Sequence, residues 1–339
     1  MLSTSYRLVE PKRFEPVQVS LPTTDSVLVQ PTYLSICNAD QRYYQGKRDP
    51  QVLVRKLPMA LIHEAIGRVA YDDTGTFERG QRVVLVPNVA EEENPCIAEN
   101  YLLSSKFCGS GTDGFLQEVV ALDKTRAIPV PDSVPDEVAA FTELVSVASH
   151  AIDRFDAIAH GDRSRIGVWG DGNLGFIVAL LLTAKFPDTQ VVVFGRNQQK
   201  LNDFSFLTET HIAGSGDALP VDHVFECCGG TGSVSAIQEA IGLIKPEGTI
   251  ALLGVSENDV PIETRMVLEK GLRLFGSSRS GRSDFRNVVD LYAANPHIVS
   301  YLQTLVGNVV DVNTVDDIAS AFELDMVKRS GKTILKWNI

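Results

Sequence analysis

The sequence lacks the features that mark membrane, secreted and nucleic-acid-binding proteins. Its most apolar run, residues 176–186, is well short of the roughly 20 residues that span a bilayer. No basic start precedes an apolar core, so we expect no signal peptide, and no repeat or low-complexity tract is visible. Acidic residues outnumber basic ones by 43 to 31, and the net charge of -12 argues against a surface for nucleic acid or anionic membrane.

Cysteine is also scarce, and its spacing does not suggest a disulfide framework. Reduced thiols in a soluble, cytoplasmic protein are therefore expected, with a metal ligand as one use for a thiol. The adjacent pair near residue 227 is interpreted as plain packing, with a redox pair as the weaker alternative. The five cysteines are Cys37, Cys96, Cys108, Cys227 and Cys228.

The clearest positive signal is a strand, glycine turn, helix and second strand in succession over residues 166–194. The turn carries the spacing G-x-G-x-x-G between a predicted strand (166–169) and a predicted helix (176–186), the context that this motif requires. Such a turn lets a pyrophosphate approach the N–H groups of the helix N-terminus, which predicts dinucleotide binding. The predicted cofactor-binding residues of the turn are Gly170, Gly172, Asn173, Leu174 and Gly175.

The residues after the second strand favour NADP over NAD. An NAD-binding unit would normally place an acid there for the ribose 2′-hydroxyl, but this chain has Gly195 and Arg196, with Lys200 four residues further on. Arg196 and Lys200 can share one side of the next helical turn and meet a 2′-phosphate. A solvated basic helix start is the alternative.

The 339 residues predict two domains in an α/β fold. Predicted strands at 27–36, 67–71, 81–87 and 114–122 form an antiparallel β domain, and a helix over 136–155 leads out of it. Strands at 223–227, 249–254 and 272–277 with a helix at 234–244 extend the nucleotide-binding unit into a doubly wound parallel sheet. A helix from about 284, a strand, a helix over 315–325 and a final strand from 332 then return to the β domain. The predicted limits are 1–145, 146–290 and 291–339.

Four residues outside the glycine turn have the chemistry of a zinc site. Cys37, the pair His63 and Glu64, and Glu143 offer thiolate, imidazole and carboxylate, and a catalytic zinc needs three such ligands and an open position. Each of them alone is more often a structural residue.

Segments 35–46, 61–69, 142–151, 171–175 and 332–337 resemble the zinc-dependent medium-chain dehydrogenase/reductase family. This resemblance implies a GroES-like β-rich catalytic domain built from both chain ends, a Rossmann domain between them, an active site in the cleft, and a homodimer. It makes Cys37 and His63 zinc ligands and Glu64 and Glu143 alternating ligands, with Asp40 orienting a ligand imidazole.

The chain departs from the family pattern at several positions. Ile62 and Ala65 replace glycines beside His63 and Glu64, so the local backbone is expected to differ. Ala39 stands where a Ser or Thr usually begins a proton relay, so the proton must take another route through Glu64 or Glu143. The lobe that binds a structural zinc needs four cysteines, but residues 88–109 contain two, which predicts one catalytic zinc and no structural zinc.

Segments 37–49, 194–206, 225–233, 251–258 and 276–285 look like those of the TarJ-type ribulose-5-phosphate reductases of teichoic-acid and capsule pathways. The resemblance implies reduction of D-ribulose 5-phosphate by NADPH to D-ribitol 5-phosphate, and a complex with the cytidylyltransferase that uses this product. The turns Gly254–Val255 and Ser277–Ser278 then border the nicotinamide. Candidates for binding the substrate phosphate are Arg42, Lys47, Arg48, Arg279 and Arg282.

Two other functions remain open from the sequence. A polyol dehydrogenase acting on an unphosphorylated sugar alcohol would show an acid at position 195 or 196, which is absent. A non-catalytic NADPH-binding protein should have lost the zinc-ligand residues, and all four are present. The segment 330–333 (SGKT) lacks the first glycine and the preceding strand of a phosphate-binding loop.

Overall fold

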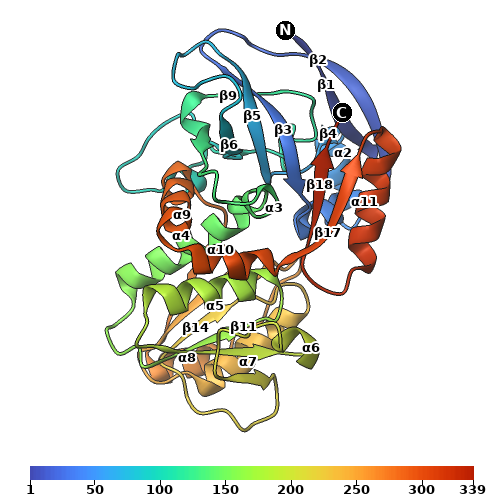
Figure 1. Cartoon of the computed structure of the whole chain (residues 1–339). Coiled ribbons are helices and arrows are strands. Elements are labelled where there is room, and N and C mark those ends of the chain that lie inside the picture. Colours follow the sequence, from blue (N-terminus) through green and yellow to red (C-terminus); the bar gives the residue numbers. More distant parts are fainter. The chain divides into compact units, whose positions relative to one another are not determined.

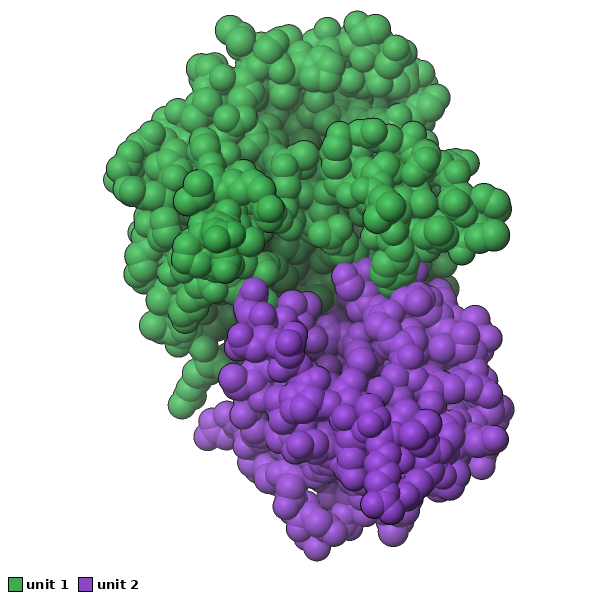
Figure 2. All heavy atoms as spheres, turned by 180° about the vertical axis from the view of Figure 1, so that it is seen from behind, with its two compact units in different colours: residues 1–146, 279–339 green, residues 147–278 purple.

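The computed structural model describes residues 1–339 and divides into two compact units. Unit 1 consists of Met1–Ser146 and Arg279–Ile339, and unit 2 of Val147–Ser278 (Figure 2). Helix α9 (Arg282–Ala294) falls in unit 1, whereas the sequence analysis gave residues up to 290 to the nucleotide-binding domain. No helix combines the length and apolarity needed to cross a bilayer.

Unit 2 is a doubly wound α/β domain. Its six strands are all parallel, in the order β13-β12-β11-β14-β15-β16, which is the 3-2-1-4-5-6 order of dinucleotide-binding folds. The strands are β11 (Arg165–Trp169), β12 (Gln190–Gly195), β13 (Thr210–Ile212), β14 (His223–Glu226), β15 (Thr249–Leu252) and β16 (Arg273–Gly276). The helices are α5 (Asn173–Lys185), α6 (Gln198–Leu201), α7 (Gly232–Leu243) and α8 (Thr264–Lys270).

The central strand and its helix explain why this sequence folds in this way. Every residue of β11 is buried, as expected for a parallel strand covered on both faces. Helix α5 is apolar around most of its circumference, and Trp169 stacks on Phe194 with ring centroids 4.0 Å apart. The predicted strand, turn, helix and strand are all confirmed, although α5 begins at Asn173, within the predicted turn.

Unit 1 is built on sheets in which every strand pair except β17–β18 is antiparallel. A three-stranded sheet has the order β2-β1-β4, a larger one has the path β10-β6-β5-β3-β18-β17, and β9 pairs with β3. The strands of the first part are β1 (Leu2–Glu10), β2 (Arg13–Ser20), β3 (Val27–Ser35), β4 (Met59–Ala60), β5 (Ala65–Asp72), β6 (Arg82–Leu85), β7 (Asn88–Val89), β8 (Lys106–Phe107), β9 (Val120–Leu122) and β10 (Ala127–Pro129). The helices of the first part are α1 (Asn38–Tyr44), α2 (Pro50–Lys56), the short η1 (Glu99–Tyr101) and η2 (Lys124–Arg126), and α3 (Asp136–Ala139).

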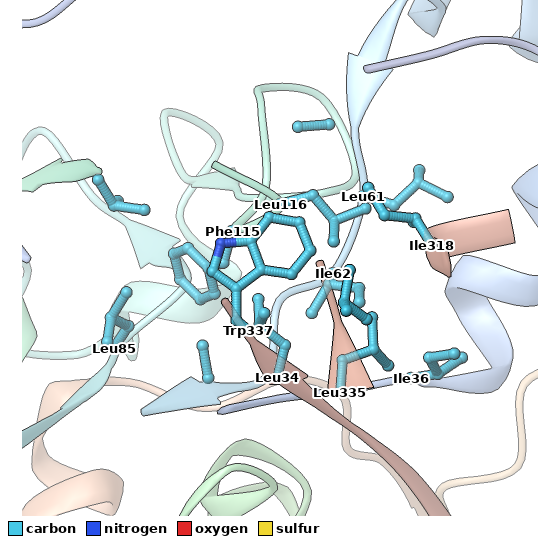
Figure 3. Close-up of a cluster of buried hydrophobic side chains, with 14 of the residues drawn as sticks. Leu34, Ile36, Leu61, Ile62, Leu85, Phe115, Leu116, Ile318, Leu335 and Trp337 are labelled. Carbon is cyan, nitrogen blue, oxygen red and sulfur yellow. The ribbon is translucent and has the colours of Figure 1, made fainter. Parts of the chain in front are cut away.

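The C-terminal segment completes the large sheet of unit 1. After α9 come α10 (Pro296–Gln303), β17 (Val306–Val312), α11 (Val315–Val327) and β18 (Lys332–Trp337). Strand β18 pairs antiparallel with β3 and parallel with β17 (Figure 1). Trp337 and Leu335 therefore enter the same hydrophobic core as Leu34 and Ile62 (Figure 3).

The structure corrects three expectations about the elements of the chain. The strand predicted over 114–122 is limited to β9, because the N–H groups of Gly114 and Phe115 donate to the carbonyls of Ala60 and Ile62 instead of a strand ladder. The helix predicted over 136–155 is interrupted between α3 and α4 (Thr142–Ile158), where the Thr142 hydroxyl donates to the Ala139 carbonyl. Strands β1 and β2 were not among the predicted elements.

Candidate active site

Three predicted zinc ligands lie together in unit 1. Cys37 precedes α1, and His63 and Glu64 lie in the short segment between β4 and β5. Their ligand atoms are all within 4.8 Å of one another. His63 and Glu64 are buried and Cys37 is half-buried. The fold thus brings together a thiol, an imidazole and a carboxylate, although Cys37 lies far from His63 and Glu64 in the sequence.

Asp40 links the two segments that carry these donors. One of its carboxylate oxygens accepts from the Cys37 N–H at 3.0 Å, and the other accepts from the Ile62 N–H at 3.0 Å. The latter oxygen also lies 3.5 Å from Nδ1 of His63. Although burial disfavours the imidazolium, the charges of Asp40 and Cys37 raise the pKa of His63 well above its ordinary value. With Nδ1 facing Asp40, Nε2 is the ring nitrogen left to bind a metal.

The backbone beside His63 keeps a glycine-like conformation although glycine is absent. Ile62 has a φ of +68°, in the left-handed region that side chains rarely adopt. Its side chain is fully buried in the core of unit 1 (Figure 3). Burial of the isoleucine and the hydrogen bond from its N–H to Asp40 offset this strain.

Glu64 is held by a buried ion pair. Nζ of Lys332, in β18, lies 2.7 Å from one carboxylate oxygen and donates to the other at 2.8 Å, and both side chains are at most 2% exposed. Lys332 belongs to the SGKT segment, where no phosphate-binding loop was predicted. It contacts a carboxylate instead, and the sequence analysis did not include it among the site residues.

Glu143 lies in the first turn of α4, close enough to His63 and Glu64 to interact electrostatically with both. It is outside the group of three whose ligand atoms are within 4.8 Å. Its side chain is buried and makes no hydrogen bond or ion pair, and burial raises the pKa of its carboxyl to about 7. Its predicted role as an alternating zinc ligand stays a prediction.

The donor set fits zinc. Thiolate, imidazole and carboxylate in one group, with Asp40 behind the imidazole, are the ligand types and the supporting contact that a catalytic zinc uses. Three donors leave a position for a substrate oxygen. The assignment of Cys37, His63 and Glu64 as ligands is a prediction that this geometry supports.

The glycine turn of unit 2 has the shape that a dinucleotide needs. Gly170 has a φ of +135°. A Cβ at Gly175 would lie 2.0 Å from the carbonyl oxygen of Gly170, so only glycine lets α5 approach the strand this closely. A Cβ at Gly172, the residue before α5, would meet nothing within 4 Å, which leaves open space where a pyrophosphate is expected. Asn173 and Leu174 begin α5, as the dinucleotide motif requires.

The end of β12 excludes the acid of an NAD site. A Cβ at Gly195 would lie 2.6 Å from Cβ of Asp171 and 2.8 Å from the side chain of Leu201. Asp171 accepts hydrogen bonds from the N–H groups of Arg196 and Asn197, at 2.7 and 2.8 Å. Arg196 is exposed and Lys200 half-buried, and neither forms an ion pair within the chain. Two cations thus follow the end of β12, and their predicted contact with a 2′-phosphate stays a prediction.

The two predicted nicotinamide turns lie at the same edge of the sheet as the glycine turn. Gly254 and Val255 follow β15, and Ser277 and Ser278 follow β16, both parallel to β11. The buried carboxylate of Glu226, another residue that the sequence analysis missed, accepts from the Gly254 N–H at 3.1 Å and from the Cys228 N–H at 2.9 Å. Buried polar contacts such as these fix the shape of the cofactor turn.

Comparisons with known proteins agree with this geometry. Residues 23–132 match the family model of the alcohol dehydrogenase GroES-like domain, and residues 184–294 match that of zinc-binding dehydrogenases. The chain is 51% identical to a ribulose-5-phosphate reductase of Bacillus spizizenii, with 100% of each chain covered. It is 49% identical to ribulose-5-phosphate reductase 1 of Staphylococcus aureus, with 99% of each covered.

This chain belongs to the ribulose-5-phosphate reductase family of zinc-binding dehydrogenases. A crystal structure of S. aureus TarJ in complex with NADPH matches it over 100% of both chains, with a TM-score of 0.89 and 45% identity. The predicted fold, a Rossmann sheet with a GroES-like domain, is thereby confirmed, as is the family resemblance. Membership in this reductase family also supports NADPH and zinc as the cofactors.

Proposed function

We propose that this protein reduces D-ribulose 5-phosphate to D-ribitol 5-phosphate with NADPH. The observation that carries the proposal is the similarity, along the whole chain, to ribulose-5-phosphate reductases at 43–51% identity. The three metal donors within 4.8 Å support it, because a non-catalytic relative would have no need to keep them.

The residues divide the work between the two units. Cys37, His63 and Glu64 would hold zinc, and the turn around Gly172 would hold the pyrophosphate of the cofactor. When bound, zinc polarises the C2 carbonyl of the ketose as a Lewis acid and NADPH supplies the hydride. The protein's own contribution is to position these groups and to supply a proton to the new hydroxyl.

Glu143 is the better of the two candidate proton donors. Glu64 is locked in its ion pair with Lys332, whereas Glu143 has no partner and a pKa of about 7. A carboxyl with this pKa is partly protonated at neutral pH and is suited to general acid catalysis. Glu143 would thus supply the proton that, in the family pattern, passes through a Ser or Thr at the position of Ala39.

Arg196 and Lys200 are proposed to bind the 2′-phosphate of NADPH. The support is steric as well as electrostatic, because Gly195 leaves no room for the carboxylate that an NAD site would use. A preference for NADPH favours use of the enzyme as a reductase.

Three further expectations belong to the same proposal. By resemblance to its family, the protein is expected to form a homodimer and a complex with a ribitol-5-phosphate cytidylyltransferase, with its product feeding teichoic-acid or capsule synthesis. A cytoplasmic location is in keeping with five unpaired cysteines.

The test is a direct assay on the purified protein. We expect one zinc per chain and oxidation of NADPH on addition of D-ribulose 5-phosphate, with much slower turnover of D-ribulose, D-xylulose 5-phosphate and NADH. Equal rates with phosphorylated and unphosphorylated ketoses would favour the polyol dehydrogenase. Zinc and NADPH binding without turnover of any of these ketoses would leave a non-catalytic protein.

A further inference from the structure

We infer that Arg279 binds the phosphate group of the substrate and sets the preference for a phosphorylated ketose. The inference rests on the proposed function, since it names a role within that reaction. Five arginines and lysines were candidates from the sequence, and the place of Arg279 beside the donors and the pairing of Arg282 with Glu99 favour Arg279 over Arg282.

Arg279 lies beside the donor cluster of unit 1. Its guanidinium carbon is 4.7 Å from the centre of the Phe107 ring, and the Phe107 and His63 rings are 5.2 Å apart between centroids. The guanidinium is therefore within about 10 Å of the imidazole. Five bonds of about 1.5 Å separate C2 of ribulose 5-phosphate from phosphorus, so a substrate with its carbonyl at the donors can reach Arg279.

Arg279 is a half-buried cation that lies over the Phe107 ring and has no anionic partner. It forms no hydrogen bond and no ion pair in the chain, whereas Arg282, three residues later, is held by Glu99 through contacts at 2.6 and 2.8 Å. Burial lowers the pKa of Arg279, and the negative charge of Glu143 partly opposes this. A guanidinium removed from water without an anion is costly, and a bound phosphate would supply that anion.

The backbone holds Arg279 in an unfavourable conformation. Its φ is +61°, a region that costs of order 1–3 kcal/mol for a residue other than glycine. The next residue is fixed, because the Ser280 hydroxyl is 2.7 Å from that of Ser146, which in turn donates to the Glu143 carbonyl at 2.7 Å. Ser146 thus contacts both the backbone of Glu143 and the residue that follows Arg279.

Two more cations surround the neighbouring Tyr43 ring. The guanidinium carbon of Arg48 is 4.9 Å and Nζ of Lys56 5.9 Å from its centre, and Tyr43 is also close enough to Arg279 to influence its pKa. Lys56 donates to the Ser110 carbonyl. Arg48 and Lys56 thus add positive charge around Tyr43, while Glu143 is the negative group that acts on Arg279.

The experiment compares kcat/KM for D-ribulose 5-phosphate and D-ribulose in the zinc-loaded protein. For Arg279→Met we expect the ratio of kcat/KM for D-ribulose 5-phosphate to kcat/KM for D-ribulose to fall about 10- to 100-fold, because charge-assisted hydrogen bonds to the phosphate are lost. The fall should come from a higher KM for the phosphorylated ketose. Arg279→Lys should recover part of the ratio. Arg286→Met, an exposed arginine of the same segment, is the matched control and should leave the ratio unchanged.

The outcomes separate the inference from the function on which it rests. If the unaltered protein does not reduce ribulose 5-phosphate, the proposed function fails. If it does and Arg279→Met keeps the preference for the phosphorylated ketose, only the assignment of Arg279 is overturned. Zinc content and the thermal midpoint are measured for each variant. If kcat/KM for both ketoses falls equally and zinc is lost as well, Arg279 has a structural role and the inference is overturned.

Discussion

Both units bury ionisable side chains, but Asp222, Arg165 and Glu226 of unit 2 have hydrogen-bond partners, whereas Glu143 and the half-buried Arg279 of unit 1 have none. In unit 2, Asp222 is bonded to Ser164 and Lys245, and Arg165 forms a two-point contact with Glu209. The buried Glu226 carboxylate accepts N–H groups of the cofactor turns. The partners of these charges offset the cost of burying them, and loss of one partner would leave an uncompensated buried charge.

Unit 1 contains buried charges of both kinds. Glu64 is paired with Lys332, but Glu143 and Arg279 have neither a hydrogen-bond partner nor an ion pair. These two groups of opposite sign lie beside the metal donors. Uncompensated buried charges lower stability, so their persistence at one place points to chemistry there rather than to support of the fold.

Replacement of Glu143 is expected to have the largest effect on activity and little effect on stability. Glu143→Gln removes a proton donor, which should lower kcat by about 10²–10⁴-fold. Because the carboxyl is buried without a partner, the thermal midpoint should stay equal or rise. Steady-state kinetics and differential scanning calorimetry measure the two quantities. Full activity with full zinc content would remove Glu143 from the mechanism.

Removal of the cation that pairs with Glu64 should, in contrast, lower stability strongly. Lys332→Met leaves Glu64 buried and unpaired, which is expected to cost about 3–5 kcal/mol of unfolding free energy. Lys336→Met is the matched control on the same strand, since Lys336 is 47% exposed and 3.5 Å from Asp311, and such a pair contributes under about 1 kcal/mol. Urea unfolding followed by circular dichroism compares them, and similar losses would contradict the distinction.

Close packing behind the donors offers a third test. A Cβ at Gly114 would lie 2.3 Å from the Ile62 carbonyl oxygen and 2.4 Å from that of Leu61, so Gly114→Ala must displace the segment that carries His63. We expect a loss of about 1–3 kcal/mol and weaker zinc retention on dialysis against a chelator. Gly111→Ala adds a Cβ in the same loop with nothing within 4 Å and should change neither quantity.

The elements that could be predicted are those whose residues encode their own conformation. Gly170 has a φ of +135° and a Cβ at Gly175 would lie 2.0 Å from the Gly170 carbonyl oxygen, so both positions of the predicted cofactor turn require glycine. The apolar residues 166–169 before it predict a buried parallel strand. Cys37, His63 and Glu64 were predicted as zinc ligands from residue type and family pattern, and the structure brings their ligand atoms within 4.8 Å of one another, although zinc binding itself stays a prediction. In the missed strand β1 the buried positions include Ser3 and Ser5, and β2 contains Pro16, so an alternation of apolar and polar residues gave little signal.

What could not be predicted depends on contacts between distant segments. Lys332 reaches Glu64 across 268 positions, and nothing near either residue indicates this partner. Ile62 adopts a φ that its residue type disfavours, because Asp40 and the core hold it there. Strand 114–122 is shortened by hydrogen bonds to the segment before His63. At the candidate site, therefore, backbone conformation and side-chain pairing depend on distant segments more than on the neighbouring sequence.

Replacement of Asp40 tests how much zinc affinity depends on a carboxylate that holds the predicted ligands in place without being one of them. Asp40→Asn keeps the shape of the side chain but replaces one acceptor oxygen with an amide group, which weakens its hold on the Cys37 and Ile62 N–H groups. We expect zinc affinity or activity to fall about 10- to 100-fold. Competition with a chromogenic chelator measures zinc affinity directly. An unchanged affinity would show that Ile62 and the core hold His63 without this carboxylate.

The smallest expected effect concerns Glu209 of unit 2, which pairs with Arg165, and it appears as a change in thermal stability at acid pH. Hydrogen bonds from Arg165 lower the pKa of Glu209 to about 2, with His211 assisting. Because the folded pKa is below the unfolded one, Glu209 contributes stability above about pH 4.5 and loses it as the pH falls toward 2. Thermal midpoints of the unaltered protein and Glu209→Gln should therefore converge between pH 6 and about pH 3. Since both proteins lose zinc alike in acid, their difference isolates Glu209, and a difference that stays constant with pH would contradict its assigned pairing.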